Sequence, residues 1–291
     1  MTAANQELAD FLRRARGAVD PARAGLPADG RVRRVPGLRR EEVALLAGVS
    51  TDWYTRLEQG RRITPSDGVL DAVARALDLG PAGRAHLGHL VGAPAGRGAP
   101  RAATPQRARP GLRQLMEAMD GQPALLLGRR TDVLAANRMA HALLPDLDRL
   151  PARERNYARW VFCTEAARAL FVDWDVQARA VVENLRLDVG TDPGDRAAAE
   201  LVDELSAASP DFRRWWAEHR VHQRTHGQKR LRHPVVGELT VDYETLTLPG
   251  DPDQALFVYS APAGTASREA LDLLASWSLT SGPRVVGQKP R

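Results

Sequence analysis

The chain has 291 residues, of which 43% are hydrophobic and 26% are charged, as in an ordinary folded protein rather than a disordered one. No stretch approaches the ~18 apolar residues of a membrane-spanning helix, and no apolar signal segment follows Met1. The single cysteine, Cys163, cannot form an internal disulfide, which fits a reducing compartment. We therefore expect a cytoplasmic protein with no membrane partner.

Positive charge is concentrated in the first third of the chain. Residues 1–110 carry 18 Arg and no Lys against 11 acidic residues, a net charge of +7, whereas the remaining residues have a net charge of −2. A basic part joined to a near-neutral part favours a polyanion-binding module with a separate second module. A basic surface that only keeps the protein soluble would give the same charge.

The first 110 residues divide into helices, one long loop and a linker. Residues 7–19 have the apolar spacing of an amphipathic helix, and residues 20–37 form a basic loop rich in Pro and Gly. The pattern is helical again from 38 to 91. Residues 92–110 contain no large apolar side chain and cannot fold alone. We therefore predict a mainly α domain over residues 1–91, a linker over 92–110, and a second domain over 111–280.

The second domain has an α+β pattern. The expected helices are 112–119, 137–144, a helix-rich stretch over 156–220 broken near 191–194 and 209–210, and 267–277; the expected strands are 123–127, 132–135, 229–233, 237–248 and 255–260. The longest strand alternates, with Leu239, Val241 and Tyr243 on one face. The turn at 249–253 makes a hairpin with the last strand.

The strongest motif lies at residues 38–60. Helix 39–47, expected to turn Val43, Leu46 and Ala47 inward, ends at Gly48, which permits the positive φ of a tight turn. Val49 can fill the angle between the two helices, and Ser50 is a good N-cap for the next helix. In that helix Tyr54 and Leu57 are three residues apart and face the core. This is the pattern of a helix-turn-helix that places its second helix in the major groove of double-stranded DNA.

The outer face of the second helix carries the candidate base-reading residues. Arg56 could bind guanine bidentately, and Asp52 could accept from cytosine or orient Arg56. The expected DNA-binding residues are Arg39, Arg40, Ser50, Thr51, Asp52, Trp53, Thr55, Arg56, Arg61 and Arg62, with the four arginines outside this helix on phosphates. Trp53 could instead pack against sugar or a neighbouring helix. A helical bundle with a basic surface is the alternative to DNA binding.

Residues 38–60, with the Glu58-Gln59-Gly60 ending and the following Pro65-Ser66, resemble the helix-turn-helix of the Cro/lambda-repressor, or xenobiotic-response-element, type. The stretches at 156–162 (NYARWVF), 212–216 (FRRWW) and 231–246 (LRHPVVGELTVDYETL) extend the resemblance to the MmyB-like regulators. This resemblance implies a PAS-like C-terminal domain, with a small antiparallel sheet and helices packed on one side. It also implies that this domain holds a fatty-acid-like or other hydrophobic ligand.

Aromatic residues gather in the second domain and could line an apolar pocket with a few polar anchors. Tyr243 and Tyr259 could offer hydroxyls from adjacent strands. The candidate ligand-binding residues are Asn137, Asn156, Arg159, Trp160, Phe171, Trp215, Tyr243 and Tyr259. Alternatively, these aromatics are only core. The domain could also serve only to dimerise the protein, or it could be an enzyme.

The sequence gives little support to catalysis or metal binding. His219, His222 and His226 have the i, i+3, i+7 spacing of one helical face, but neighbouring Arg and Lys residues would repel a cation. We therefore predict a non-enzymatic regulator without a metal or cofactor. It would act as a homodimer that reads two half-sites about one DNA turn, roughly 34–36 Å, apart.

Overall fold

The computed structural model describes residues 3–24, 26, 37–61, 63–92, 106–151, 154–192, 194–223 and 225–280. Most of the expected linker 92–110, most of the basic loop 20–37, and Arg62 lie outside these described residues. The chain forms two compact units. The helical unit comprises residues 1–104 and 180–223, and the sheet unit comprises residues 105–179 and 224–291.

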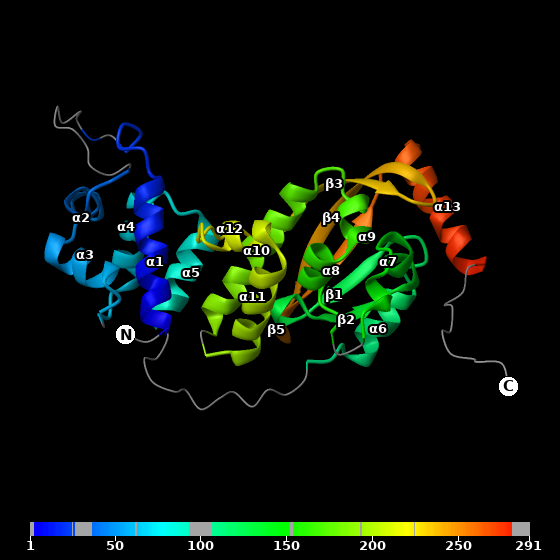
Figure 1. Ribbon diagram of the computed structural model, residues 1–291, viewed down its shortest axis with the longest axis horizontal. Helices are drawn as coiled ribbons and strands as arrows, with labels where there is room; N and C mark the ends of the chain where they lie inside the picture. Colours follow the sequence, from blue (N-terminus) through cyan, green and yellow to red (C-terminus); the bar gives the residue numbers. More distant parts are fainter. Residues whose placement is uncertain are drawn as a thin grey trace. The chain divides into compact units, whose positions relative to one another are not determined.

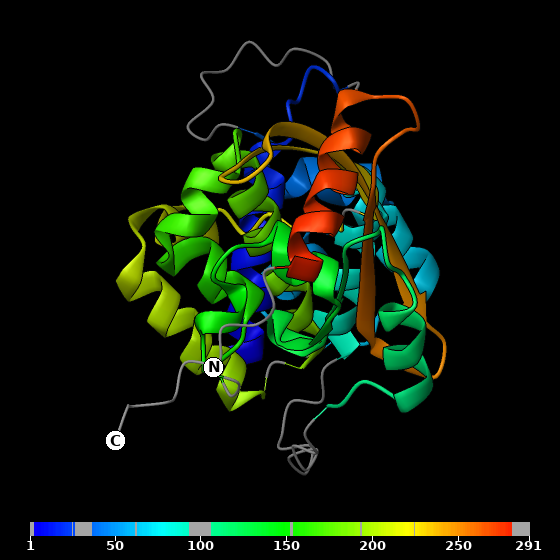
Figure 2. The same cartoon turned by 90° about the vertical axis from the view of Figure 1, so that its right-hand side faces the viewer.

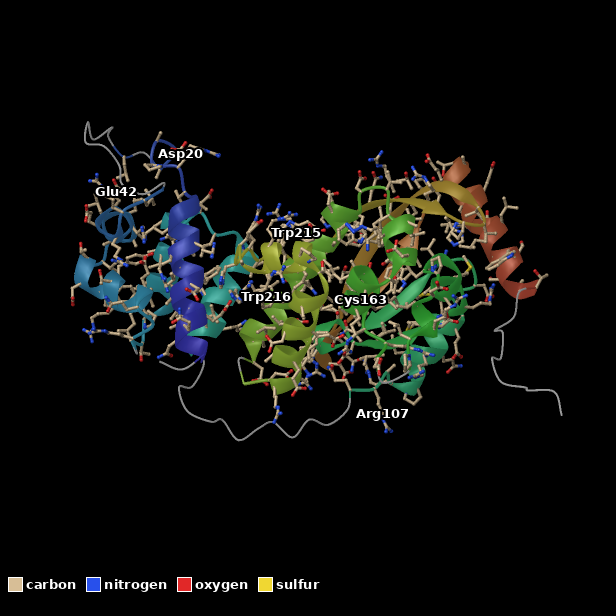
Figure 3. The ribbon with its side chains drawn as sticks, in the orientation of Figure 1. Asp20, Glu42, Arg107, Cys163, Trp215 and Trp216 are labelled. Atoms are coloured by element: carbon tan, nitrogen blue, oxygen red, sulfur yellow. The ribbon has the colours of Figure 1, made fainter. Side chains whose placement is uncertain are left out.

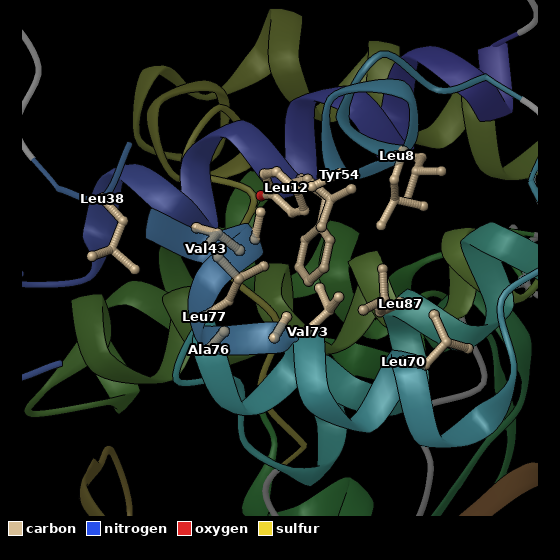
Figure 4. Packing of buried hydrophobic residues seen from close by; sticks show 14 of the residues in the cluster. Leu8, Leu12, Leu38, Val43, Tyr54, Leu70, Val73, Ala76, Leu77 and Leu87 are labelled. Atoms are coloured by element: carbon tan, nitrogen blue, oxygen red, sulfur yellow. The ribbon is translucent and has the colours of Figure 1, made fainter. Parts of the chain in front are cut away.

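The helical unit begins with five helices that match the expected N-terminal domain (Figure 1). They are α1 (Ala3–Ala18), α2 (Arg40–Ala47), α3 (Thr51–Glu58), α4 (Asp67–Ala76) and α5 (Pro81–Gly92). Their apolar faces meet in one core, to which α1 gives Leu8 and Leu12, α3 gives Tyr54, and α4 gives Val73 (Figure 4). In α2 the inward residues are Val43, Ala44 and Ala47, so the expectation that Leu46 faces inward is wrong: its side chain is exposed.

A segment from the middle of the chain completes the helical unit. It contains the end of α10 (Trp174–Thr191), then α11 (Arg196–Ala208) and α12 (Pro210–Trp216). The predicted breaks near 191–194 and 209–210 are confirmed. Asp195 and Ser209 cap the helices that follow them, because their side chains accept backbone N–H groups. Residues 180–223 thus pack with residues 1–104, although the sequence places them within the second domain; the boundaries at 91 and 110 stay a prediction.

The sheet unit contains five strands and the remaining helices. Its strands are β1 (Ala124–Leu127), β2 (Val133–Ala136), β3 (His226–His233), β4 (Gly237–Leu248) and β5 (Asp251–Ser260). Its helices are α6 (Pro110–Glu117), η1 (Arg129–Thr131), α7 (Arg138–Leu143), η2 (Leu147–Arg149), α8 (Tyr157–Cys163), α9 (Glu165–Leu170) and α13 (Ala266–Thr280). The helix α13 runs beside β4 and packs against α7 (Figure 2). This is the α+β class predicted from the sequence.

The sheet is antiparallel throughout, in the order β2-β1-β5-β4-β3. Leu126 pairs with Leu256, and both pack with Met116 of α6 on one face. Tyr243 pairs with Tyr259 on the opposite face, where α8 supplies Tyr157. Helices therefore cover both faces of the sheet, so the one-sided arrangement that the resemblance implied is wrong.

Two strands are longer than expected. The third begins at His226 rather than at Lys229, and the fifth begins at Asp251 rather than at Ala255. The turn between β4 and β5 is therefore only Pro249 and Gly250. The polar starts of both strands pair with β4, and exposed strand residues of this kind give little hydrophobic signal in a sequence.

Candidate DNA-binding and ligand-binding sites

The turn between α2 and α3 is built as the sequence indicates. Gly48 has a φ of 67°, in the left-handed region that favours glycine. Ser50 Oγ accepts the backbone N–H of Trp53 at 3.1 Å and so caps α3. Tyr54 and Leu57 are fully buried, which fixes the side of α3 that faces the core. These contacts define which side of α3 is left for a partner.

The opposite side of α3 faces outward. Thr51, Asp52 and Arg56 are exposed, and Trp53 and Thr55 are half-buried. Trp53 also packs against the edge of the N-terminal core, as a packing residue would. Thr51, Asp52 and Arg56 are therefore presented to the outside, whereas Trp53 also contacts the core; the base contacts of all five candidates stay predictions.

A buried carboxylate holds three helices of this unit together. Glu58, at the end of α3, has no exposed side-chain surface; its carboxylate accepts from Arg16 Nε of α1 at 2.7 Å and from Arg40 Nε of α2 at 2.8 Å. Burial alone would raise the pKa of Glu58, but hydrogen bonds and charge from the two arginines hold it below its ordinary value. This role of Glu58 was not predicted from the sequence, although Glu58 lies one turn beyond Tyr54 on the inner face.

The expected phosphate-binding arginines surround this motif. Arg39 precedes α2 and is half-buried, and its backbone N–H donates to Glu42 at 2.7 Å. Arg40 is exposed even though its Nε is paired with Glu58, and Arg61 is exposed beyond α3. Arg62 lies outside the described residues. Arg39, Arg40 and Arg61 thus stay predicted phosphate contacts.

Two of the candidate ligand residues, Asn137 and Asn156, make structural contacts. Buried Asn137 caps α7 by accepting from Ala140 N at 2.8 Å, accepts also from Ala124 N, and donates to the carbonyl oxygens of Met116, Met119 and Gln122. Buried Asn156 caps α8 and donates to Arg130 O and Asp132 Oδ1 at 2.6 and 2.9 Å. These bonds occupy both amide groups, and a ligand-binding role for either residue stays a prediction.

The aromatic candidates of the sheet unit gather around a lysine. Lys229 of β3 is buried, and its Nζ lies 3.4 Å from both Tyr157 Oη and Tyr259 Oη. The rings of Tyr157, Phe171, Tyr243 and Tyr259 lie 5.6, 5.7, 5.0 and 5.2 Å from this ammonium nitrogen. We call these five residues the Lys229 cluster. The sequence predicted Phe171, Tyr243 and Tyr259 but missed Lys229 and Tyr157, since no local pattern joins them.

The remaining candidates are placed differently. Trp160 of α8 is fully buried; its ring lies 5.8 Å from that of Phe171, and its Nε1–H donates to Pro145 O at 2.8 Å. Arg159 is half-buried on the same helix. Trp215 belongs to α12 in the helical unit, next to Trp216 (Figure 3), so it is not part of the Lys229 cluster.

The predicted common helical face of His219, His222 and His226 is wrong. The helix α12 ends at Trp216, and His226 begins β3. His219 instead has a φ of 52° and its Nδ1 lies 3.3 Å from Glu7 Oε1. Within the described residues, no group of three His, Cys, Asp or Glu side chains is placed to hold a metal ion. None of the described helices has the length and apolar composition needed to cross a bilayer.

Comparison with known families assigns a domain to each part of the chain. Residues 108–274 match the family described as the MmyB-like transcription regulator ligand binding domain, and residues 7–87 match a helix-turn-helix domain. No curated protein matches the chain. Because the first match alone covers more than half of the sequence, the chain belongs to the MmyB-like transcription regulators and combines a helix-turn-helix DNA-binding domain with a ligand-binding domain.

Proposed function

We propose that this regulator reads a specific operator through α3 and changes its operator affinity when a small hydrophobic, fatty-acid-like molecule binds the second domain. It would act in the cytoplasm, without catalysis, as a homodimer on two half-sites. The observation that carries the DNA-reading role is the outward side of α3, where Thr51, Asp52 and Arg56 are exposed on a helix fixed from behind by Tyr54, Leu57 and Glu58.

Arg56→Ala tests sequence reading. A bidentate contact from arginine to guanine contributes about 1–3 kcal/mol of discrimination, so this variant should lose roughly 5- to 150-fold in operator affinity and far less on random DNA. The measurement is a fluorescence-anisotropy titration on both DNAs at several salt concentrations.

Arg61→Ala is the matched control. Arg61 is exposed and would contact phosphate, so its loss should weaken binding to both DNAs alike and lower the salt slope by about one unit. Arg40→Ala is a poorer control, because it also removes an ion pair of Glu58. Equal losses on operator and random DNA for Arg56→Ala would contradict base reading.

Ligand sensing is supported by the buried aromatic side chains around Lys229, which pair apolar surface with convergent polar atoms. A ligand that binds only the folded protein must raise its melting temperature. A fatty acid that binds here should shift the melting temperature and change operator affinity by about 5- to 150-fold. A ligand that binds without changing operator affinity would contradict the proposed coupling.

Dimerisation alone is the second candidate role of the sheet unit. On α13, Leu273 and Trp277 are one turn apart with 64% and 42% of their surface exposed. Apolar side chains at this spacing are suited to a helix-to-helix contact with a second copy. A stable dimer by light scattering, with no melting shift from any fatty acid, would favour this role over ligand sensing.

A further inference from the structure

The Lys229 cluster joins residues that are far apart in the sequence. Tyr243 pairs with Tyr259 across β4 and β5, and Gly227 pairs with Tyr243 across β3 and β4. Lys229 lies two residues beyond Gly227 and thus on the same face of the sheet. The helix α8 brings Tyr157 to this face, so its hydroxyl and that of Tyr259 both lie 3.4 Å from Lys229 Nζ.

Every polar group named in this cluster can donate a hydrogen bond. An ammonium group donates only, and a phenol that accepts from it still has its own proton. Tyr157 and Tyr259 also share a side-chain hydrogen bond, so one of their two protons is used between them until a ligand oxygen replaces that bond. Burial, together with the neighbouring tyrosines, raises the pKa of Tyr157, and burial is also the main reason that the pKa of Tyr259 is raised. Both phenols therefore stay protonated at neutral pH. A positive charge with convergent donors is the chemistry that recognises an oxyanion.

Apolar surface adjoins these donors. The ring of Phe171 lies 5.7 Å from the Lys229 ammonium nitrogen. The ring of Trp160 lies 5.5 Å from the ring of Tyr157 and 5.8 Å from the ring of Phe171. Trp160 and Phe171 are both buried. The cluster thus places one cationic group beside buried aromatic side chains, the two kinds of contact that a molecule with a charged head and an apolar tail would use.

We propose that Lys229, with the hydroxyls of Tyr157 and Tyr259, binds the carboxylate of the ligand and makes the second domain selective for anionic over neutral amphiphiles. This inference rests on the proposed ligand-sensing function and adds the residue that selects the head group. If Lys229 only stabilised the fold, its replacement would lower the melting temperature. Replacing a buried charge by an apolar side chain of similar volume is often neutral or stabilising, so Lys229→Met should fold with an unchanged or raised melting temperature.

The test compares two probes with the same tail, decanoate and 1-decanol, by calorimetric titration of the full chain near neutral pH. We expect the protein to bind decanoate at least about tenfold more tightly than decanol, the ratio that a single charge-assisted hydrogen bond can supply. Lys229→Met should abolish this preference, because it should weaken the binding of decanoate and leave the binding of decanol unchanged. Tyr157→Phe and Tyr259→Phe, which keep the rings, should each reduce decanoate binding by a smaller factor.

Arg232→Met is the matched control, because Arg232 lies on the same strand with 64% of its side chain exposed. It removes the same charge and should leave both affinities unchanged. Two results would overturn the anion site while leaving ligand sensing intact: equal binding of the two probes by the wild-type chain, or a preference that survives in Lys229→Met and both Phe variants. Binding of neither probe would overturn the proposed fatty-acid sensing itself.

Discussion

At the residue scale, His86 of α5 links burial to pH. It has no exposed surface, its ring lies 4.9 Å from that of Phe11, and neither ring nitrogen has a hydrogen-bond partner among the described residues. Burial is the main reason that the pKa of His86 is lowered from 6.5 to about 4. The folded helical unit therefore holds this imidazole neutral over a pH range in which the unfolded chain would protonate it.

Because of this lowered pKa, the free energy of unfolding depends on pH. Between pH 6.5 and 4 the unfolded state binds the extra proton, so the free energy of unfolding falls as the pH is lowered, by at most about 3 kcal/mol for this residue. The lowered pKa of Glu7, about 2, acts in a separate range below 4.5. His86→Leu should reduce the loss of stability between pH 6.5 and 4, measured by urea unfolding at each pH.

His89 supplies the control, because it is exposed on the same helix. His89→Gln should change the pH profile much less than His86→Leu, because burial and not His89 is the main cause of the lowered pKa of His86. The comparison uses the difference between variants, since His141 and His233 of the sheet unit also have lowered pKa values caused by burial. An unchanged slope in His86→Leu would show that His86 is not the group that titrates.

At the element scale, the packing of α10 against α5 depends on the absence of a side chain at Gly190. A Cβ atom there would clash with the ring of His86, which is buried and cannot move away freely. Gly190→Ala should therefore destabilise the helical unit by about 1–3 kcal/mol, as overpacking does. Gly68 of α4 is the opposite case, because no atom lies within 4 Å of an added Cβ atom. Gly68→Ala should therefore stabilise the helical unit by about 0.5–1 kcal/mol.

Thermal unfolding of the two alanine variants measures both effects. Helix propensity alone would make both substitutions stabilising, so that result would mean that α10 does not pack closely on α5.

The elements that the sequence predicted well are those with local signals. The turn at Gly48, the cap at Ser50 and the alternation of Leu239, Val241 and Tyr243 each follow from residues a few positions apart. The start of β3 was missed because residues 226–228 include no apolar side chain, and only pairing with β4 makes them a strand. The Lys229 cluster could not be predicted, because its members come from α8, the residue that follows α9, and three strands, which meet only in the folded unit.

At the scale of the whole molecule, a buried ion pair joins distant parts of the sequence. Arg186 of α10 has 1% of its side chain exposed and binds the carboxylate of Glu7 in α1 and the backbone oxygen of Trp216. Its guanidinium also lies 3.9 Å from the ring of Trp216 and 3.0 Å from His219 Nδ1. Residues matched by the ligand-binding family thus hold the first helix of the DNA-binding domain.

A double-mutant cycle can measure this contact. Removing one partner of a buried pair leaves an uncompensated charge, so Arg186→Met and Glu7→Gln should each destabilise the helical unit by about 3–5 kcal/mol. The double variant should lose much less than the sum, because no charge is then left unpaired. Exposed Arg196, paired with Glu200 on α11, provides a control: Arg196→Met should cost under about 1 kcal/mol. Simple additivity would mean that Glu7 and Arg186 are not coupled.

The same variants test how ligand binding in the second domain changes operator affinity. Coupling between ligand and operator binding needs a structural element that both sites influence. The helix α10 is such an element, because its residues up to 179 belong to the sheet unit and those from 180 belong to the helical unit. The double variant Glu7→Gln/Arg186→Met should still bind decanoate and operator DNA separately, because neither residue belongs to α3 or to the Lys229 cluster. The effect of decanoate on operator affinity should shrink several-fold, measured by anisotropy with and without the fatty acid. Full retention of that effect would place the coupling elsewhere, since the ion pair that joins α1 to α10 would then be dispensable for it.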